Sequence, residues 1–461
     1  RSLLAMRSAC ALLLCALAAL VVVASAEHSI LDFGGIPSAT DNDSCWTNSA
    51  ALTAAILAAN SSSTDRVALV PAGYSFYIFE VEASYLQNVT IRIDGDLFVS
   101  NNITAWPTEN PRHTLSALYI GDSNGIILEG SGVYDGQGYD WWWTVLLTAV
   151  DQRPMLVGME RVENLVIREL TFQNSPYYHL DIRDMKNVHI YDIVIWVDMF
   201  KQKELLKQFG HWDHTYQKLA GFPEEAVEFG IPTFPLNTDG IDPQGIDILI
   251  ENVTISNFDD AVAVKPQNGG SKFSNCSEQI IIRDSTVNFG VGMTIGSVPP
   301  NDKGNCVRDV LFDNITFNHP IKAIYVKTNP GDSGWGLINN ITYSNIVADA
   351  SLWYPIWIGP QQQKQPGTSG TGCSFFYPVV DECPTNPRVP ISNMKLVNMT
   401  MTRGVFLPGV LLCNATNPCT GFEFDNVQNE GYFVVQDDYV CENVVGSVKN
   451  SSPAPSCLST Y

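Results

Sequence analysis

Basic residues are scarce in this sequence. It has 26 Lys and Arg against 48 Asp and Glu, which gives a formal net charge of -22 at pH 7. Nucleic-acid binding depends on Lys and Arg that neutralise phosphates. We therefore expect no nucleic-acid partner, and the excess negative charge favours a soluble protein.

Long apolar runs are equally scarce. The one run of note follows Arg7, covers residues 11–24 and ends in Ala24-Ser25-Ala26. A basic start, an apolar middle and a small-residue end are typical of a secretory signal. We expect residues 1–26 to be a signal peptide, with an uncleaved anchor as the alternative. The mature protein is then secreted and has no membrane-spanning helix.

Histidine is also rare, with 7 in the chain, and no cysteine has histidines at the spacing that zinc sites use. We expect no metal and no other cofactor. Two of the 11 cysteines lie in the predicted signal, and six others lie at short spacings near the C-terminus. These six predict local disulfides, with the pairing left open: Cys373, Cys383, Cys413, Cys419, Cys441 and Cys457. An odd number leaves one free thiol, which we assign to Cys45.

Asparagines in the acceptor pattern for N-glycosylation are frequent, which agrees with secretion and predicts a glycoprotein. They are Asn42, Asn60, Asn88, Asn102, Asn252, Asn275, Asn314, Asn340, Asn398, Asn414 and Asn450. Several of them coincide with predicted turns, so turn geometry also accounts for an asparagine there.

A repeat runs through most of the chain. Each copy has a short alternating apolar strand, an Asn or Asp corner and a second short strand, as in ENLVIRELTFQNS from Glu163 and IDILIENVTISNF from Ile246. The corner before the first strand recurs at Asp247, Gln279, Asp309 and Asn340. Short strands at a period of about 30 residues without helices between them indicate a stacked solenoid.

This pattern predicts an all-β fold, a parallel β-helix in which each repeat forms one coil. Inward residues fill a continuous apolar core, and Asn or Asp at the corners tolerates left-handed backbone. A β-sandwich is the alternative, but it favours Asn-Gly hairpin turns that the repeats lack between their strands.

Three segments depart from the repeat. An Ala-rich stretch after Asn48 and through Ala59 predicts a helix that caps the first coil. Polar, helix-prone residues at about 198–235 predict an insertion, either a lid or cleft wall or simply a long loop. The part at about 370–461 is rich in cysteine. We expect residues 27–461 to form a single catalytic domain that acts as a monomer.

Four acids interrupt the apolar strands, namely Asp239, Asp242, Asp259 and Asp260. Asp239 and Asp260 are about one coil apart, so they can lie on neighbouring coils. Asp259 and Asp260 share one cleft only at a corner or a bulge. Crowded carboxylates raise the pKa of at least one of them and keep it protonated. This suits glycoside hydrolysis, with acid and base about 6.5–9.5 Å apart for inversion; corner residues or a calcium site are the alternatives.

Ordered motifs from Asp32 to about residue 360 resemble family 28 of the glycoside hydrolases, the polygalacturonases and their relatives. They are DFGGIPSATDNDS from Asp32, DGQGYDWWW from Asp135, NSPYYHL from Asn174, NTDGID from Asn237 and DDAVAVK from Asp259. The resemblance implies a right-handed parallel β-helix and a polysaccharide substrate.

The same resemblance implies roles for individual residues. Asp259 is the general acid, and Asp239 and Asp260 hold and deprotonate the attacking water, with inversion at the anomeric carbon. Lys327 falls on the lysine that binds a substrate carboxylate. Asn237, in the NTDGID motif, is expected to contact the substrate.

Two departures from the family pattern concern the substrate. Val291 stands where the family usually has histidine, and Tyr325 where it usually has arginine. Tyr325 offers only a hydroxyl and an aromatic face to a sugar. We expect a polygalacturonase, active below neutral pH, with a hydrolase of rhamnogalacturonan or xylogalacturonan, or a noncatalytic carbohydrate-binding β-helix, as the alternatives.

Overall fold

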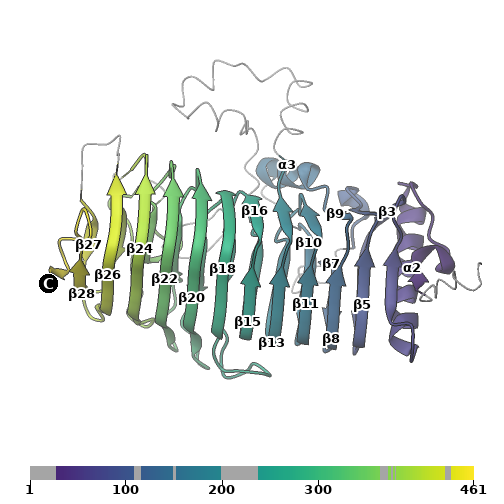
Figure 1. Ribbon diagram of the computed structural model, residues 1–461, viewed down its shortest axis with the longest axis horizontal. Coiled ribbons are helices and arrows are strands. Elements are labelled where there is room, and N and C mark those ends of the chain that lie inside the picture. The colour runs from purple at the N-terminus through teal and green to yellow at the C-terminus, as the bar shows by residue number, and fades with distance from the viewer. Residues whose placement is uncertain are drawn as a thin grey trace, which may run out of the picture.

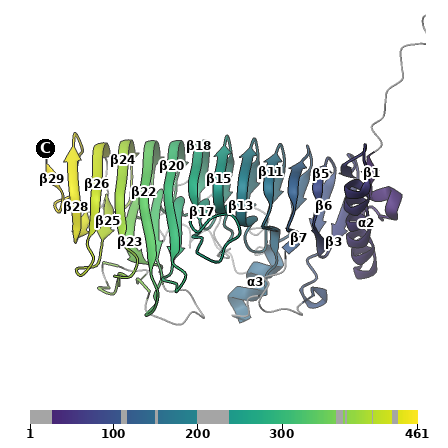
Figure 2. The ribbon, with the colours of Figure 1, turned by 90° about the horizontal axis from the view of Figure 1, so that it is seen from below.

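The computed structural model describes residues 27–107, 116–148, 152–198, 237–363, 372–374, 377–378, 380–406, 408–430 and 438–460. The predicted signal peptide and residues 199–235 of the predicted insertion lie outside these ranges. The strands stack along one long axis, and the chain advances from one end of the stack to the other (Figure 1). Seen from below, the coils stay in register along the whole length (Figure 2).

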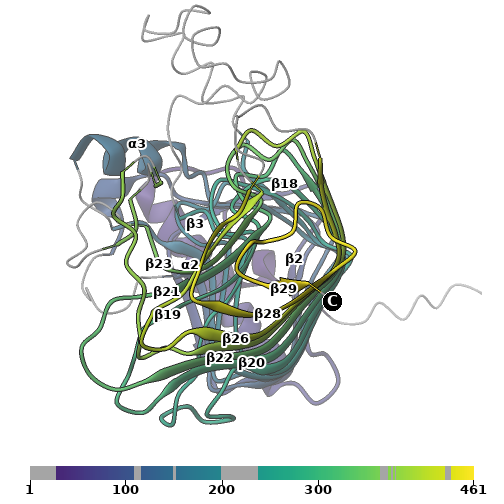
Figure 3. The same cartoon turned by 90° about the vertical axis from the view of Figure 1, so that its left-hand side faces the viewer.

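Each coil has three faces, which enclose the core when the stack is viewed from its end (Figure 3). The first face comprises β1 (His28–Ser29), β2 (Val67–Val70), β5 (Gln87–Ile93), β8 (Asn124–Glu129), β11 (Glu163–Arg168), β13 (Leu180–Tyr191), β15 (Ile241–Glu251), β18 (Glu278–Phe289), β20 (Asn305–Asn318), β22 (Gly336–Asp349), β24 (Ile391–Thr402), β26 (Cys419–Glu430), β28 (Val444–Lys449) and β29 (Ser459–Thr460).

The second face comprises β3 (Ser75–Ile78), β6 (Asp96–Val99), β9 (Val133–Asp135), β12 (Thr171–Gln173), β14 (Val194–Trp196) and β16 (Thr254–Asn257), and continues into the second halves of the long strands from β18 to β26. The third face comprises β4 (Val81–Ser84), β7 (Ser116–Gly121), β10 (Met155–Glu160), the first residues of β13 and β15, β17 (Val262–Val264), β19 (Met293–Val298), β21 (Ile324–Thr328), β23 (Ile356–Gln361), β25 (Gly409–Leu412) and β27 (Val440–Glu442).

The pairing register confirms the predicted repeat. Ile248 pairs with Ile280, Ile280 with Val310 and Val310 with Ile341, all in parallel. Each step is one turn of the coil. The right-handed parallel β-helix is therefore confirmed, and the sandwich alternative is wrong.

The predicted corner residues adopt left-handed backbone. The φ angles of Asp247, Gln279, Asp309 and Asn340 are 57°, 56°, 54° and 53°. Asn340 Nδ2 also donates a hydrogen bond to Asp309 Oδ1 on the previous coil, at 2.6 Å. Asn and Asp suit these positions because they tolerate this conformation and bond locally.

Inward-pointing side chains form one continuous apolar core. Ile, Val, Leu and Phe dominate it, and alternate residues of most strands are buried. Equivalent side chains stack from coil to coil, as where the rings of Phe312 and Tyr343 lie 4.5 Å apart between centroids. The period-2 pattern of the sequence matches this arrangement.

The N-terminal capping helix exists, but the predicted start is wrong. Helix α2 (Asn42–Ser61) covers the first end of the stack and begins before the predicted Asn48 (Figure 1). The Asp41 side chain accepts a hydrogen bond from Ser44 N at 3.0 Å, so it caps the first turn. The polar residues of this turn obscured the helical pattern.

The remaining helical elements of the described ranges are α3 (Tyr139–Thr148) and the 3-10 helices η1 (Ile30–Phe33) and η2 (Ile103–Ala105). Helix α3 was not predicted. It is fixed by tertiary contacts, since Trp142 is 1% exposed and its Nε1 donates to the Pro176 carbonyl at 3.1 Å. No helix in the described ranges is long and apolar enough to cross a membrane.

Four disulfides join nearby parts of the chain. Three pair the predicted cysteines in sequence order, Cys373–Cys383, Cys413–Cys419 and Cys441–Cys457, and the fourth is Cys276–Cys306. Among the cysteines that the structure describes, Cys45 is the free thiol, as predicted, and it is buried in α2. Multiple disulfides are typical of proteins from oxidising compartments.

Candidate active site

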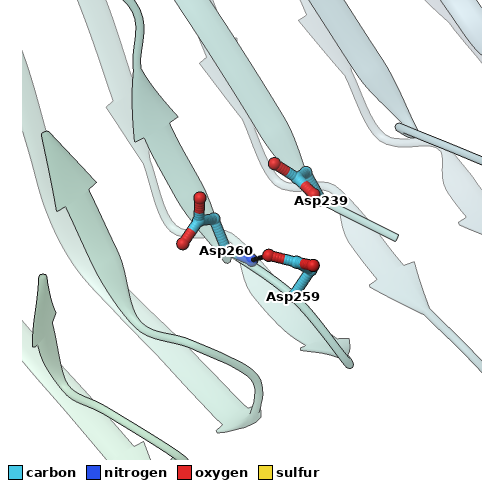
Figure 4. A group of neighbouring side chains, drawn as sticks. All are labelled: Asp239, Asp259 and Asp260. Atoms are coloured by element: carbon cyan, nitrogen blue, oxygen red, sulfur yellow. Dashed lines mark hydrogen bonds between the residues drawn. The ribbon is translucent and has the colours of Figure 1, made fainter. Parts of the chain in front are cut away.

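A corner of the coil brings the predicted acids together. Asp259 and Asp260 lie between β16 and β17, where the chain turns from one face to the next. Asp239 lies two residues before β15 on the preceding coil, and Gly240 N donates to the Asp260 carbonyl at 2.9 Å. The turn allows neighbouring acids to share one side of the sheet, as Figure 4 shows.

The three carboxyl groups face one another. One oxygen from each of Asp239, Asp259 and Asp260 lies within 4.8 Å of the others. These oxygens are nearer than the 6.5–9.5 Å expected between carboxyl groups for inversion. A water that accepts and donates hydrogen bonds of about 2.8 Å can still bridge two oxygens at this separation. The stereochemical outcome stays a prediction.

Asp259 is the least buried of the three. Its Oδ2 accepts from Asn237 N and its Oδ1 from Asp260 N, both at 2.9 Å, and the second bond is drawn in Figure 4. Burial and the neighbouring Asp260 raise the pKa of Asp259 above its ordinary value. A raised pKa keeps more of the carboxyl protonated, which a general acid requires.

Asp260 is held on both oxygens. Thr294 Oγ1 donates to Oδ1, and Lys327 Nζ donates to Oδ2, each at 2.7 Å. Asp260 is 1% exposed and Lys327 is 4% exposed, so this ion pair is buried. Short charge-assisted bonds on both oxygens fix the orientation of the carboxyl group.

Asp239 and Asp242 share a second lysine. Lys265 Nζ lies 3.0 Å from Asp242 Oδ2 and 3.6 Å from Asp239 Oδ2. Burial, with Asp242 and Asp259 nearby, raises the pKa of Asp239 well above its usual range. Burial raises the pKa of Asp242 to about 7, against the opposing effect of Lys265. The acid cluster therefore retains protons near neutral pH.

A calcium site is the alternative interpretation of the same acids. Calcium takes 6–8 oxygen ligands. Here two ammonium groups, Lys265 and Lys327, already lie beside Asp239 and Asp260 and supply the compensating positive charge. This donor set fits proton transfer better than it fits a hard divalent cation.

A buried histidine contacts the backbone of the corner that holds the acids. His179 is 0% exposed, and its Nδ1 lies 3.0 Å from the carbonyl of Asp239. Its Nε2 accepts from Ser175 N at 3.3 Å, so Nδ1 carries the proton and donates to that carbonyl. Burial lowers the pKa of His179 to about 4. The neutral ring thus positions the backbone of Asp239.

Asn237 and Tyr325 occupy the edges of the acid cluster. Asn237 accepts at Oδ1 from Arg153 Nη2 at 3.1 Å, in addition to its backbone bond to Asp259. Tyr325 is 3% exposed, and the ammonium groups of Lys322 and Lys327 lie 4.3 and 4.5 Å from its ring centroid. Substrate contact by either residue stays a prediction.

The region around Tyr325 is apolar except for these lysines. Val291 packs against the cluster that contains Tyr325 and Trp357, and its backbone N donates to the Asp259 carbonyl at 2.7 Å. Lys322 is 3% exposed and donates from Nζ to Gln363 Oε1 at 2.9 Å. It lies in the site although the sequence did not single it out.

A cavity of about 450 Å³ adjoins Asp242 and Lys265. Its walls carry amide, hydroxyl and charged groups: Tyr178, Asp181, Arg183, Asp242, Gln244, Lys265, Pro266, Asn268, Ser297, Pro299, Asn301, Asn305 and Asn329. Such groups hydrogen-bond to sugar hydroxyls, so the cavity extends the site along the polar side of the third face.

The profile of Glycosyl hydrolases family 28 matches residues 61–452. The chain belongs to this family. It is 23% identical to the probable exopolygalacturonase C of Aspergillus niger over 84% of this chain and 82% of that protein. It is 26% identical to a polygalacturonase of Juniperus ashei over 78% of this chain and 61% of that protein.

Solved structures of two polysaccharide-degrading enzymes share the fold. The endo-xylogalacturonan hydrolase of Aspergillus tubingensis superimposes with a TM-score of 0.63 and 19% identity, over 92% of this chain and 97% of that one. The polygalacturonase of Erwinia carotovora ssp. carotovora gives 0.61 and 19%, over 87% and 93%. At this identity the likeness shows the fold alone.

The family 28 motifs located the acids but not the groups around them. Thr294, Lys265, Lys322 and His179 were missed as functional candidates. Lys322 lies two residues before β21, as Asp260 lies two residues before β17. Alignment of the strand starts would therefore have found Lys322, whereas the contacts of Thr294 and His179 depend on the folded corner.

Proposed function

We propose that this family 28 hydrolase cleaves the glycosidic bonds of a pectic polysaccharide, with galacturonan as the first candidate. The convergence of Asp239, Asp259 and Asp260 within 4.8 Å carries the proposal. Burial raises the pKa of Asp259, which favours a proton donor, and the ion pair of Asp260 with Lys327 favours a carboxylate that accepts a proton in the same cluster.

Asp259 acts as the general acid. It is the acid that combines partial exposure with a raised pKa, so it can meet a glycosidic oxygen from the groove. Two backbone N–H groups hold its oxygens, and these bonds strengthen as the carboxyl loses its proton to the leaving oxygen.

Asp239 and Asp260 hold the attacking water and remove its proton. Asp239 Oδ1 has no hydrogen-bond partner among the described residues, so it is available to a water. Lys327 and Lys265 lie beside Asp260 and Asp239, where positive charge stabilises the carboxylate forms. Attack from this side gives inversion at the anomeric carbon.

The altered residues next to the acids keep the choice of polymer open. The side chain of Val291 cannot donate a hydrogen bond, and Tyr325 replaces an arginine that could bind a carboxylate bidentately. Rhamnogalacturonan and xylogalacturonan are the alternative substrates, and a binding protein without turnover is the alternative function.

We further propose that the mature protein is extracellular and monomeric. Four disulfides and the signal-like residues 1–26 support secretion. Helix α2 covers one end of the stack, which removes that end as a site for strand pairing between molecules. Light scattering on the secreted protein measures its mass in solution.

The function is tested by reducing-end release from polygalacturonate, rhamnogalacturonan, xylogalacturonan and a neutral glycan. D259N removes the proton donor with almost no change in shape, so we expect kcat to fall by about 10²–10⁴-fold on the preferred polymer. The measurement is the initial rate of wild type and variant at equal concentration.

Asp65→Asn is the matched control. Asp65 is half-buried and lies at the first end of the stack, and its side chain accepts only from Thr64 Oγ1 among the described contacts. It should keep wild-type activity. Full activity in D259N would assign the acid role elsewhere, and folded wild type that acts on no polymer would favour the binding protein.

The pH dependence follows from the same cluster. The general acid works only while it is protonated, so turnover declines as the pH rises through its raised pKa. We expect the maximum of kcat/KM below about pH 7. A maximum above about pH 8 would contradict this assignment of the acid.

A further inference from the structure

Lys322 belongs to the same row of positions as the catalytic acids. Asp239, Asp260, Val291 and Lys322 each lie two residues before a third-face strand, β15, β17, β19 and β21 respectively. Those strands pair in register through Ile241, Val262, Met293 and Ile324. Lys322 therefore ends a row that begins with the acids.

Backbone bonds hold this row together. Ala261 N donates to the Gly292 carbonyl, and Met293 N donates to the Ala323 carbonyl, both at 2.9 Å. Gly292 has φ of 82°, and an added Cβ would lie 2.3 Å from the carbonyl oxygens of Lys322 and Ala323. The close approach of these corners sets the position of Lys322.

Three lysines surround the acids, and their partners differ. Lys265 and Lys327 each pair with carboxylates, Asp242 and Asp260. Lys322 donates instead to a neutral amide oxygen, and no carboxylate of the described residues lies within ion-pair distance of it. A buried ammonium is stabilised far better by an anion than by an amide.

Two aromatic rings also lie beside the Lys322 ammonium group. Lys322 Nζ lies 4.3 Å from the ring centroid of Tyr325 and 5.1 Å from that of Trp357. Ring faces stabilise a cation only partly. Burial, and then Lys327, lower the pKa of Lys322 to about 7, against the weaker opposing effect of Asp260 and Asp259, which lie beyond ion-pair distance.

We propose that Lys322 binds a carboxylate of the substrate beside the catalytic acids, in place of the arginine for which Tyr325 stands. Lys327 is already engaged by Asp260, so Lys322 is the cation of this row with capacity for an external anion. The inference rests on the proposed function for its substrate class, an acidic sugar of a pectic chain rather than a neutral one.

Binding tests the inference without requiring turnover. A galacturonic acid oligomer and the same oligomer with its carboxyl groups reduced are titrated into D259N and into D259N with K322Q, by calorimetry. Loss of one charge-assisted bond predicts about tenfold to 100-fold weaker binding of the acidic oligomer. The reduced oligomer should bind both proteins equally, and K322R should restore affinity for the acidic one.

Lys395→Gln is the control for a change of net charge. Lys395 lies on the exposed surface and pairs with Glu423 at 3.4 Å. Equal affinity of D259N and its K322Q form for the acidic oligomer would overturn the proposal. So would an equal loss for both oligomers, because that indicates a structural role.

Wild-type protein provides a second test if K322Q does not fold. A carboxylate bound to Lys322 raises its pKa, so binding at pH 8 takes up a proton, measured from the heat in buffers of different ionisation enthalpy. K322R, whose guanidinium stays charged, should take up fewer protons. The same uptake in both proteins would overturn the proposal.

The outcomes separate this inference from the proposed function. If wild type releases no reducing ends from any polymer but affinity depends on Lys322, the carboxylate site is kept and the hydrolase is rejected. Turnover with affinity that is independent of Lys322 keeps the hydrolase and rejects the site.

Discussion

His179 shows how a residue outside the acid cluster can control the backbone of the corner that holds the acids. Its neutral ring joins Ser175 N to the carbonyl of Asp239, and it is fully buried. Protonation at Nε2 would remove the acceptor for Ser175 N and place a charge in the core. The structure of the corner therefore depends on the protonation state of His179 as well as on that of the carboxyl groups.

The folded pKa of His179, about 4, lies below the ordinary value of 6.5. The unfolded chain thus binds the proton first, and the stability that the neutral ring contributes is lost as the pH falls from 6.5 toward 4. Between pH 7 and pH 5 the loss from this residue is about 2 kcal/mol.

The measurement is urea unfolding of wild type and H179N at both pH values. Asparagine does not titrate, so the difference in unfolding free energy between the two proteins should shrink by about 2 kcal/mol at pH 5. An unchanged difference would show that His179 is not neutral and buried as described. Because other titrating groups are common to both proteins, they largely cancel.

Individual residues also show which parts of the site can be predicted from the sequence. The acids were predictable because charged residues in apolar strands are conspicuous, and the pair of Asp residues marks a corner. The partners of Asp260 were not predictable. Thr294 and Lys327 are distant in sequence and reach it only because successive coils stack in register.

At the scale of elements, the corners keep the coils in register. The long strand β22 bends twice, at Asn340 and Asn345, with φ of 53° and 55°. Asn345 Nδ2 donates to Asp313 Oδ1 on the previous coil at 2.7 Å. The corner thus combines an unusual backbone conformation with a bond between coils.

Substitution of Asn345 separates the two contributions. N345A loses the hydrogen bonds to Asp313 and from Asn398 and retains a Cβ in left-handed backbone, so we expect a loss of about 1–2 kcal/mol in unfolding free energy. N345G loses only these side-chain bonds and should be less affected. Denaturant unfolding measures both, and an equal loss would show that backbone conformation does not matter at this corner.

Elements with a regular pattern were predicted well, and those fixed by tertiary contacts were not. The strands and corners follow from alternating apolar residues and periodic Asn or Asp. The start of α2 was missed because Asp41 caps a turn of polar residues. Helix α3 was missed because its stability comes from buried Trp142 rather than from periodicity.

At the scale of the whole molecule, the net negative charge of the protein opposes the approach of the proposed acidic substrate. The net charge of -22 repels a polyanion at long range, while Lys322 and Lys327 lie at short range in the site. Salt screens long-range repulsion more strongly than contacts of buried groups. A higher ionic strength should therefore strengthen rather than weaken the binding of an acidic polymer.

We expect KM for polygalacturonate to fall as the ionic strength rises from about 0.01 to 0.15 M, because the Debye length shortens from about 30 to 8 Å. The measurement is a set of initial rates at constant pH, with methyl-esterified pectin as the control polymer. A KM that rises with salt would indicate that attraction to the lysines dominates.

Because the coils stack in parallel register, the length of the stack is independent of the geometry of the acid cluster. Strand β20 pairs with β18 and β22, and each coil is joined in this way to the coils beside it. The acids lie on two middle coils, far from both ends of the stack (Figure 1). Gain or loss of a coil at the C-terminal end would therefore change the length of the stack and leave the geometry of the acid cluster unchanged.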